Sequence, residues 1–79
     1  MSVRIQFEVT DEVHEQLTAL GLRLGCGATG DLLNNAITLL EWAEAQISAG
    51  RVIASVDDVA CTWKEVQMPV FANVRRRAA

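Results

Sequence analysis

The sequence predicts an α+β protein, mostly α-helical, that is complete only as a homodimer. Residues 3–9 alternate strictly between apolar and polar side chains, which is the spacing of a half-buried β-strand. A later helical stretch, ending at residue 48, is apolar around well over half of its circumference. One short strand and one further helix in a chain of 79 residues cannot cover such a helix, so we expect a second copy to cover it.

Composition and charge restrict the class of protein further. Apolar residues make up 51 % of the chain, so it is not disordered by composition. The formal net charge is −3, whereas nucleic-acid-binding domains are commonly basic. We find neither the apolar segment of a signal peptide nor an apolar run long enough to span a membrane. Cys26 and Cys61 form no paired motif and indicate reduced thiols. We therefore expect a cytoplasmic protein without membrane association.

The first predicted element is a strand over residues 2–9. Its inward face carries β-branched and aromatic side chains, which pack well on a pleated surface. These inward side chains are Val3, Ile5, Phe7 and Val9, and the outward ones are Arg4, Gln6 and Glu8. No second strand is adjacent in sequence, so the backbone groups of this strand lack a local partner. Antiparallel pairing with the same strand of a second copy would give a two-stranded intermolecular ribbon.

Two helices joined by a glycine-rich turn follow the predicted strand. Thr10 is a typical N-cap residue, and the acidic residues after it suit the positive end of a helix dipole. An apolar stripe at helical spacing then runs from Val13 to Leu24. The sequence GCGATG, residues 25–30, interrupts it, because each glycine costs about 1 kcal/mol relative to alanine in a helix. The second helix is expected from Thr29 or Asp31 to residue 48.

This order of parts resembles the ribbon-helix-helix DNA-binding proteins, the family of the Arc, MetJ and CopG repressors. The stretch VRIQFEVTDEVHEQL looks like the family's strand, cap and first helix, and GATGDLLNNAI looks like its turn and second-helix start. The resemblance covers about residues 2–48. It implies that residues 1–48 form a dimerisation and DNA-binding core and that residues 49–79 are a C-terminal extension.

In that family the ribbon enters the major groove of double-stranded DNA, where its outward side chains read base edges. By position, the resemblance assigns base reading to Arg4, Gln6 and Glu8. Arginine can bond to guanine and glutamine to adenine. Glu8 departs from the family pattern, because a base-reading cation or amide is commoner at this position. It can accept a hydrogen bond from cytosine N4, but it also repels phosphates. The alternative is that these residues are simply the solvated face of a strand.

The resemblance implies a second contact, at the N-terminus of the second helix. Unpaired backbone amides and the helix dipole can hold a phosphate there. Gly27, Ala28, Thr29 and Gly30 would provide this contact, with the Thr29 hydroxyl as a further donor. The turn lacks Lys and Arg, which is a second departure from the family. The alternative is an ordinary glycine-rich turn in which Thr29 is the N-cap.

The extension allows two interpretations for residues 51–68. Its β-branched residues favour a β-hairpin with a turn at residues 57–60 and a second strand that ends before Pro69. A third helix is the alternative, because Ser55 and Asp58 resemble a capping box. We favour the hairpin.

The chain ends in its only basic run, which is Arg75, Arg76 and Arg77. Such a run is either a solvated end or a contact to phosphate.

Enzyme chemistry finds little support in the sequence. His14 is the only histidine, and it lies in the first predicted helix among acidic residues. We find no nucleophile–base pair and no paired-carboxylate motif. A metal site would need clustered His or Cys, and His14, Cys26 and Cys61 do not cluster in sequence. We therefore expect no catalytic activity, no metal and no cofactor.

Two functions from different classes remain. The first is a homodimeric DNA-binding transcriptional regulator, a repressor. The second is a protein-binding module on the same fold, such as an antitoxin or a phage-encoded inhibitor of a host nucleic-acid machine, whose extension grips a protein partner. Antitoxin tails are usually disordered when free, whereas this extension has apolar residues that allow it to fold. Those residues are Ile53, Val56, Trp63 and Val66. We therefore predict the repressor.

Overall fold

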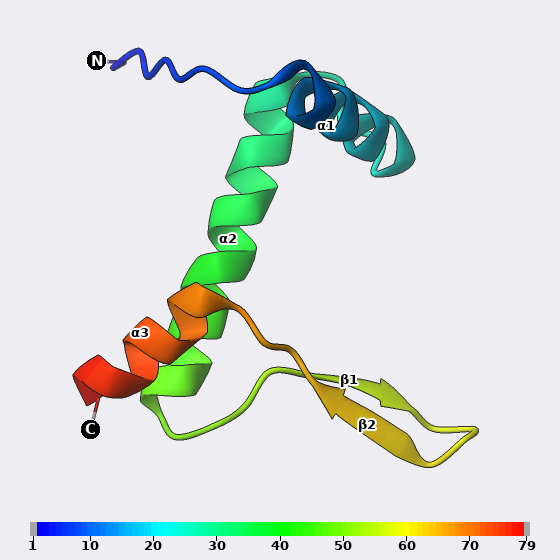
Figure 1. The fold of residues 1–79 in the computed structure, drawn as a ribbon, viewed down its shortest axis with the longest axis vertical. Helices are drawn as coiled ribbons and strands as arrows, with labels where there is room; N and C mark the ends of the chain where they lie inside the picture. The colour runs from blue at the N-terminus through cyan, green and yellow to red at the C-terminus, as the bar shows by residue number, and fades with distance from the viewer. Residues whose placement is uncertain (1, 79) are drawn as a thin grey trace. The chain divides into compact units, whose positions relative to one another are not determined.

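The structure is a computed structural model that describes residues 2–78 (Figure 1). The described residues form three helices and one two-stranded antiparallel sheet, so the predicted α+β, mostly helical class is confirmed. In chain order the elements are α1 (Asp11–Arg23), α2 (Thr29–Ser48), β1 (Ala54–Asp57), β2 (Thr62–Glu65) and α3 (Pro69–Ala78). Contacts group the chain into an N-terminal unit, Met1–Asn35, and a C-terminal unit, Ala36–Ala79.

The segment before α1 forms neither a helix nor a paired strand within residues 2–78. Its apolar side chains are exposed, at 87 % for Val3, 78 % for Ile5 and 65 % for Phe7. A lone strand cannot form ladder hydrogen bonds, so a single chain leaves this segment unpaired. The predicted intermolecular ribbon therefore stays a prediction.

Helix α1 begins as the sequence predicts. The backbone of Thr10 is extended, and its hydroxyl oxygen accepts a hydrogen bond from the amide of Val13 at 3.2 Å. This bond satisfies one of the amide groups that the first turn of a helix leaves unpaired. Asp11 and Glu12 add negative charge to that first turn.

Both long helices end in the same hydrogen-bonded motif. After α1, the amide of Cys26 donates to the carbonyl of Gly21 at 2.9 Å, and Gly25 donates to Leu22 at 3.2 Å. After α2, Arg51 and Gly50 make the equivalent bonds, each at 3.0 Å. This is the Schellman arrangement, which needs a left-handed residue after the last turn. Gly25 and Gly50 supply it, with φ values of 71° and 86°.

The C-terminal unit has a small apolar core of its own. Ala43 and Ile47 from α2 are buried together with Phe71 from α3. Partly buried apolar side chains pack against them, and these are Ile53, Val66 and Val74. Two of the four apolar residues that we expected to fold the extension therefore pack against its core. The other two, Val56 and Trp63, are exposed.

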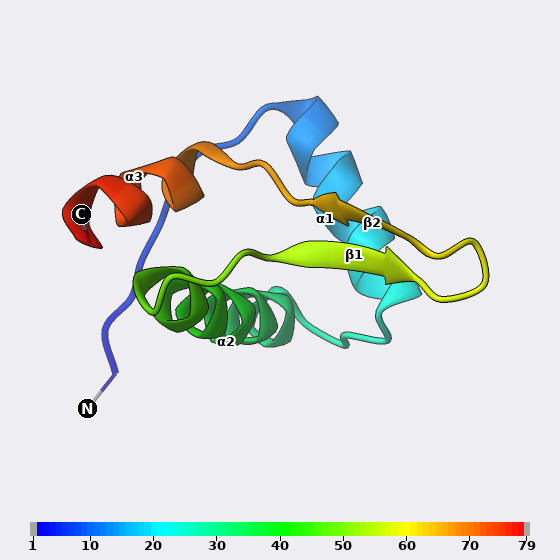
Figure 2. The same cartoon turned by 90° about the horizontal axis from the view of Figure 1, so that it is seen from below.

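The extension forms the predicted hairpin rather than the alternative helix (Figure 2). Strands β1 and β2 pair antiparallel, with Val56 opposite Trp63 and the last β1 residue, Asp57, opposite Thr62. The Asp57 carboxylate accepts hydrogen bonds from the amides of Val59 and Ala60, both at 3.1 Å, and so closes the turn. Cys61 completes the turn with φ at 53°.

Helix α3 is an element that the sequence analysis missed. The basic run was interpreted as a tail, but it is the last turn of a helix that starts at Pro69. Strand β2 already ends at Glu65, so the expectation that the strand continues to Pro69 is wrong. Proline favours the first position of a helix, where its missing N–H costs nothing. None of the helices in the described part of the chain is long and apolar enough to cross a membrane.

Candidate nucleic-acid interface

The three predicted base readers lie in the segment before α1. Arg4, Gln6 and Glu8 are all exposed, and within residues 2–78 their side chains form no hydrogen bond or ion pair. They are therefore free to contact a ligand, but nothing in the single chain orders them. Free side chains of this length lose rotamer entropy when they bind, so an ordered ribbon would be needed to position them.

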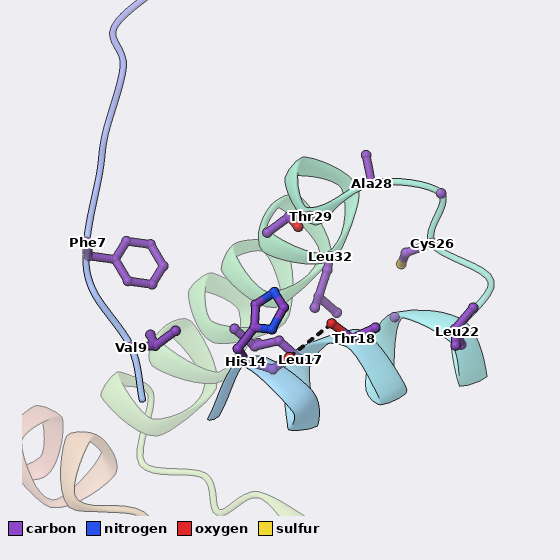
Figure 3. A pocket seen from close by; sticks show the side chains of 12 residues that line it. Phe7, Val9, His14, Leu17, Thr18, Leu22, Cys26, Ala28, Thr29 and Leu32 are labelled. Atoms are coloured by element: carbon purple, nitrogen blue, oxygen red, sulfur yellow. Dashed lines mark hydrogen bonds between the residues drawn. The ribbon is translucent and has the colours of Figure 1, made fainter. Parts of the chain in front are cut away.

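The opposite face of the same segment borders a hollow of about 420 Å³ in the N-terminal unit (Figure 3). Phe7 and Val9 point into it from the segment, and Leu17 of α1 and Leu32 of α2 face it from the helices. Arg4, Gln6 and Glu8 are not among the lining residues. A second hollow is lined by Ile5, Gln6, Phe7 and Glu8, which come from both faces. The division of the segment into an apolar inward face and a polar outward face therefore stays a prediction.

The predicted phosphate-binding residues form the other wall of this hollow. Gly27, Ala28 and Thr29 line it, while Gly30 lies in the first turn of α2 outside it. The predicted phosphate loop thus borders the same hollow as Phe7 and Val9, and this hollow is not lined by the predicted base readers.

The N-cap position of α2 is Ala28, not Thr29. The carbonyl of Ala28 accepts from the amides of Asp31 and Leu32, at 3.1 and 3.3 Å, and the residue that accepts the first helical bond is the N-cap. The interpretation of Thr29 as the N-cap is therefore wrong by one residue. Because alanine has no side-chain acceptor, the amides of Thr29 and Gly30 lack a cap and can donate to an anion.

The electrostatics of the N-terminal unit oppose this anion contact. Residues 1–35 hold two cations, Arg4 and Arg23, against five carboxylates, which gives a net charge of −3. Asp31 lies in the first turn of α2, where it stabilises the helix dipole but repels phosphate. Residues 36–79 hold five cations and five carboxylates and are neutral overall.

The three predicted tail arginines are not equivalent in the structure. A guanidinium nitrogen of Arg75 lies 2.8 Å from a carboxylate oxygen of Glu65 on β2, in a partly buried ion pair. Arg76 donates to the side-chain oxygen of Asn73, and Arg77 is exposed. Pro69, two apolar residues at helical spacing and a basic last turn are the sequence signals that could have revealed this helix.

The side chains that could ligate a metal ion are His, Cys, Asp and Glu. No group of three or more His, Cys, Asp or Glu side chains in residues 2–78 could hold a metal ion. Both Cys26 and Cys61 are free thiols. His14 lines the hollow, where its backbone carbonyl accepts from the Thr18 hydroxyl at 3.0 Å, a bond internal to α1.

Comparisons with protein-family models, with curated proteins and with solved structures find no match for the chain.

Proposed function

We propose that the chain is a cytoplasmic, non-enzymatic, homodimeric regulator of transcription that binds double-stranded DNA through an N-terminal ribbon, in the manner of the ribbon-helix-helix repressors. One observation carries the proposal. A segment with a polar face and an exposed apolar face, and without a partner strand in residues 2–78, immediately precedes a capped helix, a tight turn and a second helix.

The exposed apolar side chains support the dimer. On the N-terminal segment, Ile5 and Phe7 are 78 % and 65 % exposed. Along α2, Leu33, Ile37 and Leu40 repeat at helical spacing and are 46 %, 44 % and 44 % exposed. Fully burying one exposed side chain of this kind contributes about 1.5–3 kcal/mol, which supports a second copy that covers both sets.

The reading of bases would then fall to the polar face of the ribbon. A dimer presents two copies each of Arg4, Gln6 and Glu8. A bidentate contact from arginine or glutamine to a base discriminates by about 1–3 kcal/mol. The uncapped amides of Thr29 and Gly30 would contribute a phosphate contact that carries no sequence information.

A titration in a gel shift assay tests the proposal. The probe is a duplex of the region upstream of the chain's own coding sequence, at several salt concentrations, with a scrambled duplex of equal length beside it. We expect Arg4→Ala to weaken specific binding by about 1–3 kcal/mol per contact. Arg23→Ala is the matched control, because Arg23 is an exposed cation of the same unit in the last turn of α1. Equal losses for the two variants, or a folded wild type without salt-sensitive binding, would contradict base reading by Arg4.

A specific observation favours the protein-binding module as the second candidate. Val56 and Trp63 face each other across the hairpin and are 69 % and 63 % exposed, and Val59 in the turn is 98 % exposed. Exposed aromatic and aliphatic groups of this kind are typical of contacts to proteins. In this case Trp63→Lys would abolish the biological effect of the chain while its DNA binding and its helix content stay unchanged.

A further inference from the structure

Helix α3 differs in charge from every other element of the described chain. Its residues 69–78 include three arginines and no carboxylate, a charge of +3. By the same count α1 carries −2, α2 −3 and β1 −1, and β2 is neutral. Among the helices and strands of residues 2–78, α3 alone is therefore positive.

The packing of α3 decides which arginines are available. Phe71 is buried and Val74 is partly buried in the core of the C-terminal unit, so this face of α3 is fixed. Arg75 lies one turn after Phe71 on the same face, and Glu65 neutralises it at 2.8 Å. Arg75 thus already has a carboxylate partner within the chain.

Arg76 and Arg77 lie on the remaining surface of α3. At 100° per residue they project away from the buried Phe71, and both are exposed. The bond from Arg76 to Asn73, one turn earlier, uses one donor of a guanidinium that has five. No carboxylate in residues 2–78 forms an ion pair with either arginine. The dipole at a helix C-terminus favours cations, so it stabilises Arg76 and Arg77 in the last turn of α3. The dipole does not engage the guanidinium N–H donors that face outward.

We infer that Arg76 and Arg77 on α3 form a second contact to the phosphate backbone of duplex DNA, and that Arg75 takes no part in it. The inference rests on the proposed DNA-binding function. The N-terminal unit has a charge of −3, and of its two cations only Arg4 lies among the predicted base readers. A binding protein needs cations to displace the counterions of DNA, and a dimer gains four of them from the two copies of α3. The planar guanidinium also matches a phosphate group better than an ammonium does.

The test is the salt dependence of binding to the upstream duplex and to its scrambled version. The variant Arg76→Gln with Arg77→Gln removes two exposed charges per chain. Each lost phosphate contact lowers the slope of log K against log salt by about 0.9, so four contacts per dimer lower it by about 3.6. Affinity for both duplexes should fall by the same factor, because phosphate contacts position the protein without reading sequence.

Two controls separate this contact from simpler effects. Arg51→Gln with Lys64→Gln removes the same charge from other exposed positions of the C-terminal unit. This control should change the slope of log K against log salt by less than about 0.9, the value of one phosphate contact. Arg75→Gln should keep the slope of wild type and lower only stability, because Arg75 is bound to Glu65. Circular dichroism establishes that each variant keeps its helix content.

Several outcomes would overturn the inference. An unchanged slope in the Arg76 and Arg77 variant, with salt-sensitive binding by wild type, would exclude the α3 contact and leave the proposed function standing. An equal fall in the Arg51 and Lys64 control would show an effect of net charge alone. Wild type and the Arg76 and Arg77 variant are also sedimented with vesicles of anionic lipid. If only wild type sediments with the vesicles, and both bind DNA equally, the α3 face binds a membrane surface instead of DNA. A folded wild type that binds neither duplex would overturn both the inference and the proposed function.

Discussion

The two units of the chain differ in how much of their apolar surface they bury. In the described residues of the N-terminal unit, Leu32 is the one buried residue, whereas the C-terminal unit buries Ala43, Ile47 and Phe71 around one centre. Yet both units contain hydrogen-bonded helix ends, and the same Schellman motif follows α1 and α2. Local hydrogen bonding therefore specifies the elements in each unit, but only the C-terminal unit also supplies a core. We therefore expect the N-terminal unit to complete its core with a second copy of the chain.

Dilution should produce the largest difference between the two units. Below the dissociation constant of the dimer, we expect amides of α1 to lose most of their protection from hydrogen exchange. Amides in the β1–β2 ladder and in α3 should retain more of theirs, because their packing lies within one chain. The measurement is hydrogen exchange by mass spectrometry at two protein concentrations, with the oligomeric mass taken by light scattering. A monomer in which α1 is fully protected would contradict the dimer.

Truncation of one phenylalanine in each unit sharpens the contrast. Phe71→Ala removes a side chain that is 5 % exposed and should cost about 3–5 kcal/mol. Phe7→Ala, at a side chain 65 % exposed in the single chain, should cost about as much only if a second copy covers it. The free energy of unfolding from urea titrations of the dimer gives both values.

Gln6→Ala is the control for the faces of the N-terminal segment. It should cost under about 0.5 kcal/mol, as a surface substitution does. Equal losses at Phe7 and Gln6 would show that the two faces are assigned the wrong way round.

The two Schellman glycines give a matched pair, one in each unit. Alanine at Gly25 or Gly50 would meet no atom within 4 Å, so the left-handed backbone is the source of any cost. We expect each substitution to destabilise by about 1–2 kcal/mol. Gly27→Ala also meets nothing within 4 Å but has no positive φ, so it should be neutral or slightly stabilising. Thermal unfolding of the three variants measures this, and a cost at Gly27 equal to the others would refute the backbone explanation.

Sequence patterns predicted the parts of the fold that depend on local physics. Thr10 is predicted correctly as a cap, because a cap acts through a bond to a residue within one turn. The favoured hairpin was also correct, since β-branched residues and an aspartate at the turn agree with each other. The N-cap of α2 was wrong by one residue because threonine is the usual cap type, and nothing local shows that Ala28 takes that position instead.

The candidate site was harder to predict, because its residues depend on contacts between distant parts of the chain. The ion pair from Glu65 to Arg75 spans ten positions in sequence and joins a strand to a helix that was missed. Nothing in the run of three arginines distinguishes the one that is neutralised from the two that remain exposed. Likewise, Phe7 is exposed in the single chain, so its covering by a second copy and the pairing of the N-terminal strand both stay predictions.

The smallest effect should come from that ion pair, although it looks well made. Both carboxylate oxygens of Glu65 are engaged, one by Arg75 at 2.8 Å and the other by the Gln67 amide at 3.0 Å. The two charged side chains are nevertheless 39 % and 29 % exposed, so water and salt screen their attraction. Pairs of this kind contribute under about 1 kcal/mol. A double-mutant cycle with Glu65→Gln and Arg75→Gln isolates the coupling from other changes, and we expect the coupling to shrink as salt is added. Because the core around Phe71 holds α3 in place, the helix should persist in all three variants. A coupling energy above about 2 kcal/mol, insensitive to salt, would mean that the pair rather than the core fixes α3, and the C-terminal unit would then be far less self-sufficient than its buried side chains indicate.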